Sequence, residues 1–166
     1  MSEVLLHIKG SQLQGEDSDS IELTTQGELQ YGDNGCTLAY EETEGEGESI
    51  RTEICVADRV VTMQKKGAVD AQFIFELGKT FITSYKTPFG DLDVSLLPTL
   101  VDAKVERDQG KIELEYVLKD VYKRQVSLLS VIFLLYIFDV RRENPFLKEK
   151  NCKKLGNSGI LYNRKI

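Results

Sequence analysis

The strongest constraint on the fold is the stretch 60–94, VVTMQKKGAVDAQFIFELGKTFITSYKTPFGDLDV, in which turn signals separate runs that alternate apolar and polar residues. Between residues 71 and 77 the odd positions are apolar, while Gln72 and Glu76 are polar, which predicts a strand with one buried face. Gly78-Lys79 predicts a two-residue hairpin that pairs this strand with residues 80–86. Pro88 and Gly90 then signal another turn. The stretch therefore predicts a β-meander.

The same alternation recurs along most of the chain, and turn residues separate its runs. Asn34-Gly35, Ala57-Asp58 and Gly110 lie at the predicted turns. About ten short strands at this spacing, with no helical periodicity before residue 120, favour an antiparallel up-and-down barrel over a sandwich with crossing connections. We expect strands at residues 4–9, 21–29, 36–40, 50–56, 60–66, 71–77, 80–86, 92–96, 101–105 and 111–118.

Charge is distributed unevenly along the 166 residues. Residues 1–119 carry 11 Lys and Arg against 23 Asp and Glu, a net charge of −12, whereas residues 120–166 carry 10 against 4, a net charge of +6. Because nucleic-acid affinity depends on basic residues that neutralise phosphates, we expect no nucleic-acid partner for the acidic part. A basic protein remains a candidate partner.

The N-terminal segment and the cysteines point to the cytoplasm. MSEVLLHIKG lacks the basic region and the long apolar region of a secretory signal. Cys36, Cys55 and Cys152 are odd in number, and the first two lie in predicted strands without metal-binding spacing. We therefore expect free thiols, a cytoplasmic location and no membrane association.

Two groups of residues are candidates for catalysis or metal binding. His7 is the single histidine, and no partners at suitable spacing accompany it, so we expect a surface or strand-edge imidazole. The loop 41–48, EETEGEGE, lacks the pattern of a calcium-binding loop, so we expect a solvated acidic loop. We predict no catalytic residue, no metal site and no cofactor.

Four residues are the candidate ligand-binding site. Tyr40, Tyr85 and Tyr116 share the phase of apolar neighbours, so their hydroxyl groups could face a cavity inside the barrel, although ordinary core packing is the alternative. Lys65 shares the phase of Val61 and Met63. If that phase is interior, its ammonium group needs a carboxylate, a water or an anionic ligand.

The central stretch also carries a family resemblance, over roughly residues 3–119. It is similar to the signature of the YwiB-like bacterial proteins of unknown function, F-x-x-G-x-x-x-x-x-x-Y-x-T-P-F/Y-G-x-L preceded by a basic residue and Gly. The resemblance implies a calycin-like, lipocalin-type barrel and no assigned activity. An Arg is common in the family where Lys65 stands here. The matching residues are Lys65, Gly67, Phe75, Gly78, Tyr85, Thr87, Pro88, Phe89, Gly90 and Leu92.

The end of the chain departs from the family pattern. Residues 120–125, DVYKRQ, are similar to the in-frame translation of a transposase adapter used to prepare sequencing libraries. We therefore expect residues 1–119 to form the barrel without its native closing strand, and residues 120–166 to be a non-native, irregular tail. In one alternative, the apolar run 126–138 is a membrane anchor, but 13 residues span only about 20 Å as a helix, which is short of a hydrocarbon core of about 30 Å. Another alternative is a strand that fills the vacated edge.

Two function classes remain. The first is a non-enzymatic module whose barrel holds one small, partly apolar ligand against Tyr40, Lys65, Tyr85 and Tyr116. The second is an interaction module with a filled barrel, whose acidic outer face meets a basic protein. We expect no enzymatic activity in either case.

Overall fold

The computed structural model describes residues 1–44, 47–88, 90–107, 109–121, 128–140 and 161–165. Within these ranges the chain forms eleven strands and no helix. The strands are β1 (Ser2–Gln14), β2 (Asp17–Gly32), β3 (Gly35–Glu44), β4 (Glu48–Ala57), β5 (Val60–Gly67), β6 (Ala71–Phe75), β7 (Phe81–Thr87), β8 (Gly90–Glu106), β9 (Gln109–Asp120), β10 (Leu128–Asp139) and β11 (Leu161–Lys165).

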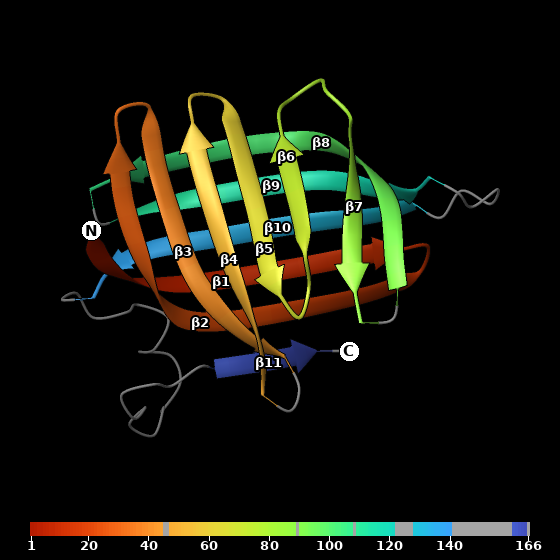
Figure 1. The fold of residues 1–166 in the computed structure, drawn as a ribbon, viewed down its shortest axis with the longest axis horizontal. Coiled ribbons are helices and arrows are strands. Elements are labelled where there is room, and N and C mark those ends of the chain that lie inside the picture. Colours follow the sequence, from red (N-terminus) through yellow and green to blue (C-terminus); the bar gives the residue numbers. More distant parts are fainter. Residues whose placement is uncertain (45–46, 89, 108, 122–127, 141–160, 166) are drawn as a thin grey trace.

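The strands form one antiparallel sheet that curls into a nearly closed barrel. Its order is β6-β5-β4-β3-β2-β1-β10-β9-β8-β7, with β11 paired to β2 beside this path. Strands β3 to β7 cross one side of the barrel, and β1, β2, β8, β9 and β10 run across the other side at a steep angle (Figure 1). The long strands β2 and β8 pair with neighbours on both sides and so join the two layers. The predicted all-β, antiparallel barrel is confirmed.

The barrel has one unsealed seam, between β6 and β7. Asp70 and Lys86 exchange two backbone hydrogen bonds of 3.0 and 2.8 Å, and the Thr83 hydroxyl donates to the carbonyl of Gln72, but no continuous ladder joins these strands in the described chain. The predicted Gly78-Lys79 hairpin is therefore wrong. The turn instead has Leu77 and Gly78 as its central residues, and the N–H of Lys79 donates to the carbonyl of Glu76 at 3.2 Å.

Two other predicted hairpins are present, each with its loop one residue away from the predicted pair. Asp33-Asn34 connects β2 to β3 as a two-residue loop, and Asp58-Arg59 connects β4 to β5 in the same way. Gly35 ends the first of these loops with φ +154°, and a Cβ atom there would lie 1.9 Å from the carbonyl oxygen of Val56. Only glycine fits at this position, because the neighbouring hairpin backbone occupies the space of a side chain.

The alternation places a continuous apolar core inside the barrel. Phe75, Ile112 and Leu114 are fully buried, and the Phe75 ring packs edge-on against Tyr116 with 4.9 Å between ring centroids. One position of this alternation differs. Leu77 lies in the turn after β6 and is 56% exposed. Leu92, near the start of β8, is 42% exposed but lines the interior cavity described below.

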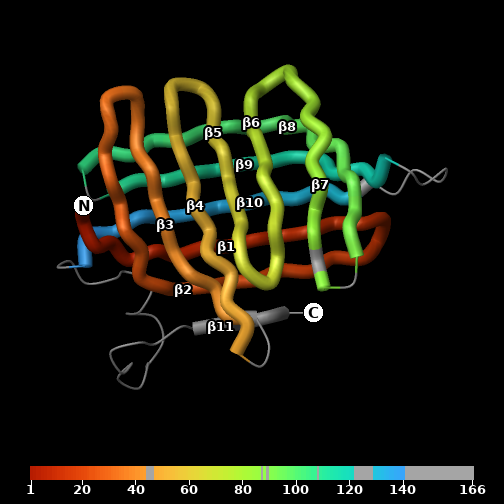
Figure 2. Tube along the Cα trace, viewed as in Figure 1, coloured from red at the N-terminus to blue at the C-terminus, as the bar shows by residue number. Residues whose placement is uncertain are grey.

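The C-terminal part differs from the irregular tail that we expected. Residues 128–139 form β10, which lies between β9 and β1 and is paired to both along its length (Figure 2). Val131, Leu135 and Ile137 alternate into the core, so the run has the period of a strand with one buried face. The alternative in which this run fills the edge beside β9 is therefore the one adopted. Whether residues 120–166 are native stays a prediction.

The membrane-anchor alternative does not describe this segment, since its residues 128–138 are strand. Among the described residues, no helix is long and apolar enough to cross a membrane.

Candidate functional site

A cavity of about 490 Å³ occupies one end of the barrel interior. Its wall includes residues from every strand of the barrel path except β4, among them Ile8 of β1, Leu23 of β2 and Val131 of β10. Gly10 contributes to a wider space, because a Cβ atom at this position would meet nothing within 4 Å. Most of the wall is apolar, whereas the polar groups gather at a few points. The cavity falls within the size range of small-ligand sites.

One ion pair lies in the wall of the cavity. The Nζ atom of Lys65 lies 3.3 Å from Oε2 of Glu42, and their side chains are 22% and 19% exposed. Lys65 therefore faces the interior, and a carboxylate supplies the partner that such an ammonium group needs. Glu42 is a correction to the sequence prediction, which placed it in a solvated acidic loop. Its position two residues after Tyr40, in the same phase of β3, was the signal for an inward-facing side chain.

Two tyrosines share the cavity wall with this ion pair. Tyr85 and Tyr116 line the cavity, and the Tyr85 ring lies 6.0 Å from that of Phe73. Burial raises the pKa of Tyr116, and the nearby Tyr85 raises it further. The hydroxyl of Tyr116 is protonated at neutral pH, as an ordinary tyrosine is, and the raised pKa extends this state to more alkaline pH, so the group can donate a hydrogen bond inside the barrel.

Tyr40 lies behind the cavity wall rather than in it. It is buried, and the strand register places it opposite Thr52, which in turn lies opposite Lys65. Burial and the adjacent Glu42 raise the pKa of Tyr40 well above its usual value. The oxygens of Thr52 and Glu42 are near enough to influence this pKa, yet neither Tyr40 nor Thr52 makes a well-formed side-chain hydrogen bond to a described residue.

The structure thus brings the four predicted site residues into one region. Lys65, Tyr85 and Tyr116 line the cavity, whereas Tyr40 is buried outside the lining, opposite Thr52. The three tyrosines come from β3, β7 and β9, which are distant in the chain, and the barrel closes them around the same interior.

His7 lies on the opposite face of β1 from the cavity. The prediction of a surface or strand-edge imidazole is wrong, because His7 is only 3% exposed. Its Nδ1 atom lies 2.9 Å from the Thr24 hydroxyl oxygen, and its Nε2 atom lies 2.9 Å from a carboxylate oxygen of Glu22. A hydroxyl, an imidazole and a carboxylate in this order are the elements of a catalytic triad, but these three lie outside the cavity described above. We interpret them as a satisfied polar cluster.

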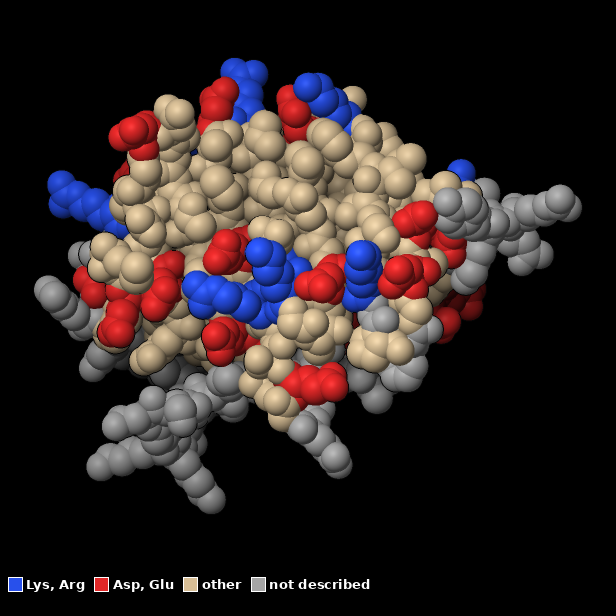
Figure 3. Space-filling model, in the orientation of Figure 1, with Lys and Arg blue, Asp and Glu red and all other residues tan. Residues whose placement is uncertain are grey.

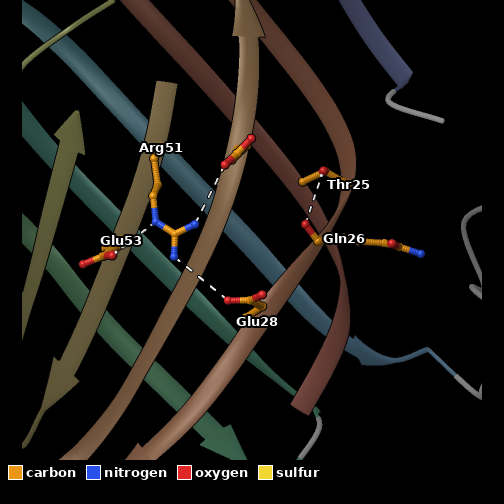
Figure 4. A network of polar contacts seen from close by, with 6 residues as sticks. Thr25, Gln26, Glu28, Arg51 and Glu53 are labelled. Atoms are coloured by element: carbon orange, nitrogen blue, oxygen red, sulfur yellow. Dashed lines mark hydrogen bonds and ion pairs between the residues drawn. The ribbon is translucent and has the colours of Figure 1, made fainter. Parts of the chain in front are cut away.

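The outer surface carries mixed charge rather than one acidic field. Acidic and basic side chains lie side by side across the face shown in Figure 3. Arg51 on β4 lies 3.3 Å from Glu53, and at 4.0 and 3.9 Å from Glu28 and Glu41 (Figure 4). One guanidinium group therefore offsets part of the charge of three carboxylates. Such exposed pairs contribute little stability.

The described residues hold two free thiols and no group of metal ligands. Cys36 is buried and Cys55 is exposed, and neither forms a disulfide. No group of three or more His, Cys, Asp or Glu residues within the described ranges could hold a metal ion. Cys152 and Glu46 lie outside the described residues.

Comparison with known proteins places this barrel in a family. Residues 6–127 match the model of a domain of unknown function, DUF1934. The chain belongs to this family. The match ends one residue before β10 begins. It covers all four candidate site residues and Glu42, so the cavity wall other than β10 lies within the family domain.

A sequence match and a structural match to YwiB of Bacillus subtilis accompany this family match. The chain is 26% identical over 113 residues to a protein described as uncharacterized beta-barrel protein YwiB of Bacillus subtilis strain 168, which covers 68% of this chain and 79% of that protein. The crystal structure of the ywiB protein from Bacillus subtilis matches with a TM-score of 0.69 and 22% identity, over 81% of this chain and 90% of that one. The predicted resemblance to the YwiB-like proteins is thereby confirmed.

Proposed function

We propose that this DUF1934 barrel is a small-ligand-binding module. The observation that supports it is the cavity of about 490 Å³, with a mostly apolar wall and one cluster of polar side chains formed by Glu42, Lys65, Tyr85 and Tyr116. Binding sites for small molecules combine these two features, since the apolar wall supplies affinity and a few polar groups fix the orientation of the ligand.

The proposal describes binding without catalysis. In the described cavity wall, Lys65 is paired with Glu42, and burial raises the pKa of the Tyr116 hydroxyl. A tyrosine that acts as a nucleophile or a base needs a lowered pKa or an adjacent free base, so the raised pKa of Tyr116 argues against this role. The free thiols of Cys36 and Cys55 support a reducing, cytoplasmic location for this module.

The second candidate function, interaction of the outer face with a basic protein, has less support. That prediction assumed a barrel whose interior is filled by side chains, whereas the interior of this barrel holds a cavity. On the face shown in Figure 3 the carboxylates are interspersed with basic side chains.

The test uses Nile red, a neutral dye whose emission shifts to the blue in apolar surroundings. The full chain is titrated with the dye, and we expect saturable binding of about one dye per barrel. Gly10→Phe is the blocking variant, because its ring would enter the open space beside Gly10. Glu3→Phe is the matched control, since it adds the same ring at an exposed position of the same strand.

We expect Gly10→Phe to abolish the emission shift and Glu3→Phe to preserve it. Equal dye binding by the two variants, or no saturable binding by the parent chain, would contradict the proposed function. Circular dichroism confirms that each variant retains the strand content of the parent chain.

A further inference from the structure

The polar cluster in the cavity is electrically balanced. Lys65 and Glu42 each keep about four-fifths of the side chain out of water, and each is the other's counter-charge at 3.3 Å. A charged head group of a ligand that enters this cluster finds no free counter-charge there, because Lys65 and Glu42 already neutralise each other. Burying such a charge is costly. The remaining charged residues of the wall, Asp19, Lys119 and Asp120, lie near strand ends.

The same cluster is rich in neutral hydrogen-bond donors. Tyr85 and Tyr116 line the cavity, and the O–H group of each is a hydrogen-bond donor that carries no net charge. Hydroxyl, carbonyl and amide groups accept such bonds without bringing a net charge.

The rest of the wall suits an aliphatic or aromatic body. Met63, Phe73, Leu118 and Phe133 enclose the space next to the polar cluster. An amphipathic ligand can therefore place its chain against this apolar wall and its head group against the donors.

We propose that the cavity selects amphipathic ligands with an uncharged, hydrogen-bonding head group over ligands of the same length with an anionic or a cationic head. The discrimination comes from the Lys65–Glu42 pair, which leaves neither charge available to a ligand. This inference rests on the proposed ligand-binding function.

The experiment compares three probes that share one chain and differ only in the head group: decanol, decanoate and decylamine. Isothermal titration calorimetry on the full chain at neutral pH measures each affinity. We expect decanol to bind at least about tenfold more tightly than either charged probe, because a charged head group in the polar cluster loses hydration where Lys65 and Glu42 are already paired with each other.

Two variants then unbalance the pair in opposite directions. Glu42→Gln leaves the Lys65 charge without its partner, so the affinity ratio should move toward decanoate by about tenfold or more. Lys65→Met leaves the Glu42 charge, and the ratio should move toward decylamine. Glu53→Gln is the matched control, since it removes a carboxylate that lies 3.3 Å from Arg51 on the outer surface. This control should keep the ranking of the parent chain.

The outcomes separate the two proposals. Binding of all three probes with equal affinity by the parent chain overturns the head-group inference and leaves the ligand-binding function in place. An unchanged ranking in Glu42→Gln and Lys65→Met also overturns it. If none of the three probes binds and Nile red does not bind either, the ligand-binding function fails as well. The ranking on the parent chain needs no variant, so it tests the inference even if a substitution unfolds the barrel.

Discussion

The Lys65–Glu42 pair should be coupled more strongly than an ordinary surface ion pair. The charged atoms are 3.3 Å apart, and at an effective dielectric constant of about 20 this separation corresponds to about 5 kcal/mol of attraction before desolvation. Desolvation of two largely buried groups removes much of that attraction. We therefore expect a net coupling free energy of about 2 kcal/mol, above the range of about 0–1 kcal/mol for exposed pairs.

A double-mutant cycle measures this coupling. Lys65→Met, Glu42→Gln and the double variant are unfolded in urea, and the free energies of unfolding are compared with the parent chain. The free energy of unfolding of each single variant should be about 2 kcal/mol lower than that of the parent chain, because each variant leaves a largely buried charge without a partner. The double variant should lose little more than one single variant, since it leaves neither charge.

The matched control is the Lys79–Glu76 pair, in which Nζ lies 3.0 Å from the carboxylate but the side chains are 61% and 31% exposed. The same cycle there should give a coupling below about 0.5 kcal/mol. A coupling at Lys65–Glu42 as small as that of the control would refute the reasoning, because it would show that water screens the two charges as effectively in the cavity wall as on the surface.

Three further predictions concern the fold and its titratable groups. Gly35→Ala should lower the free energy of unfolding, measured in urea, by about 3 kcal/mol, because the added Cβ atom would meet backbone at a strained φ. Gly10→Ala should leave this free energy nearly unchanged, and equal losses in the two variants would contradict the steric argument. Iodoacetamide should label exposed Cys55 before Cys36, because burial raises the pKa of the Cys36 thiol and limits access; peptide mass spectrometry shows the order, and faster labelling of Cys36 would contradict it. The pKa of Tyr40 is raised above 10.0 by burial. The contribution of Tyr40 to the free energy of unfolding is therefore complete below pH 10.0 and is lost as the pH rises toward the folded pKa. The difference in alkaline ultraviolet titration between the parent chain and Tyr40→Phe tests this, and a normal titration of Tyr40 would contradict it.

Much of the fold could be read from the alternation of apolar and polar residues. The period of two groups the residues that share one side of a strand, so it places Lys65, Tyr85 and Tyr116 with apolar neighbours without any knowledge of strand pairing, and all three line the cavity. Local turn chemistry indicated the loops before Gly35 and after Ala57, because a tight hairpin depends on only a few adjacent residues.

Several features required the tertiary structure. The alternation within one strand does not show which residues of other strands lie near it in the barrel. Glu42 and Lys65 are 23 residues apart, and they meet only when β3, β4 and β5 assemble. The burial of His7 depends in the same way on its neighbours Glu22 and Thr24 in β2.

The seam and the last strand of the barrel were also decided by tertiary structure. A Gly-Lys pair was locally suitable for a hairpin, but β6 and β7 are the two ends of a curled sheet whose edges meet without forming a continuous ladder. Residues 128–139 became β10 because β9 and β1 each presented a row of backbone donors and acceptors to be paired. The sequence alone determined which residues could be strands and which side of each strand avoids water. Only the assembled sheet determined which strands meet, because that depends on contacts between residues that are distant along the chain.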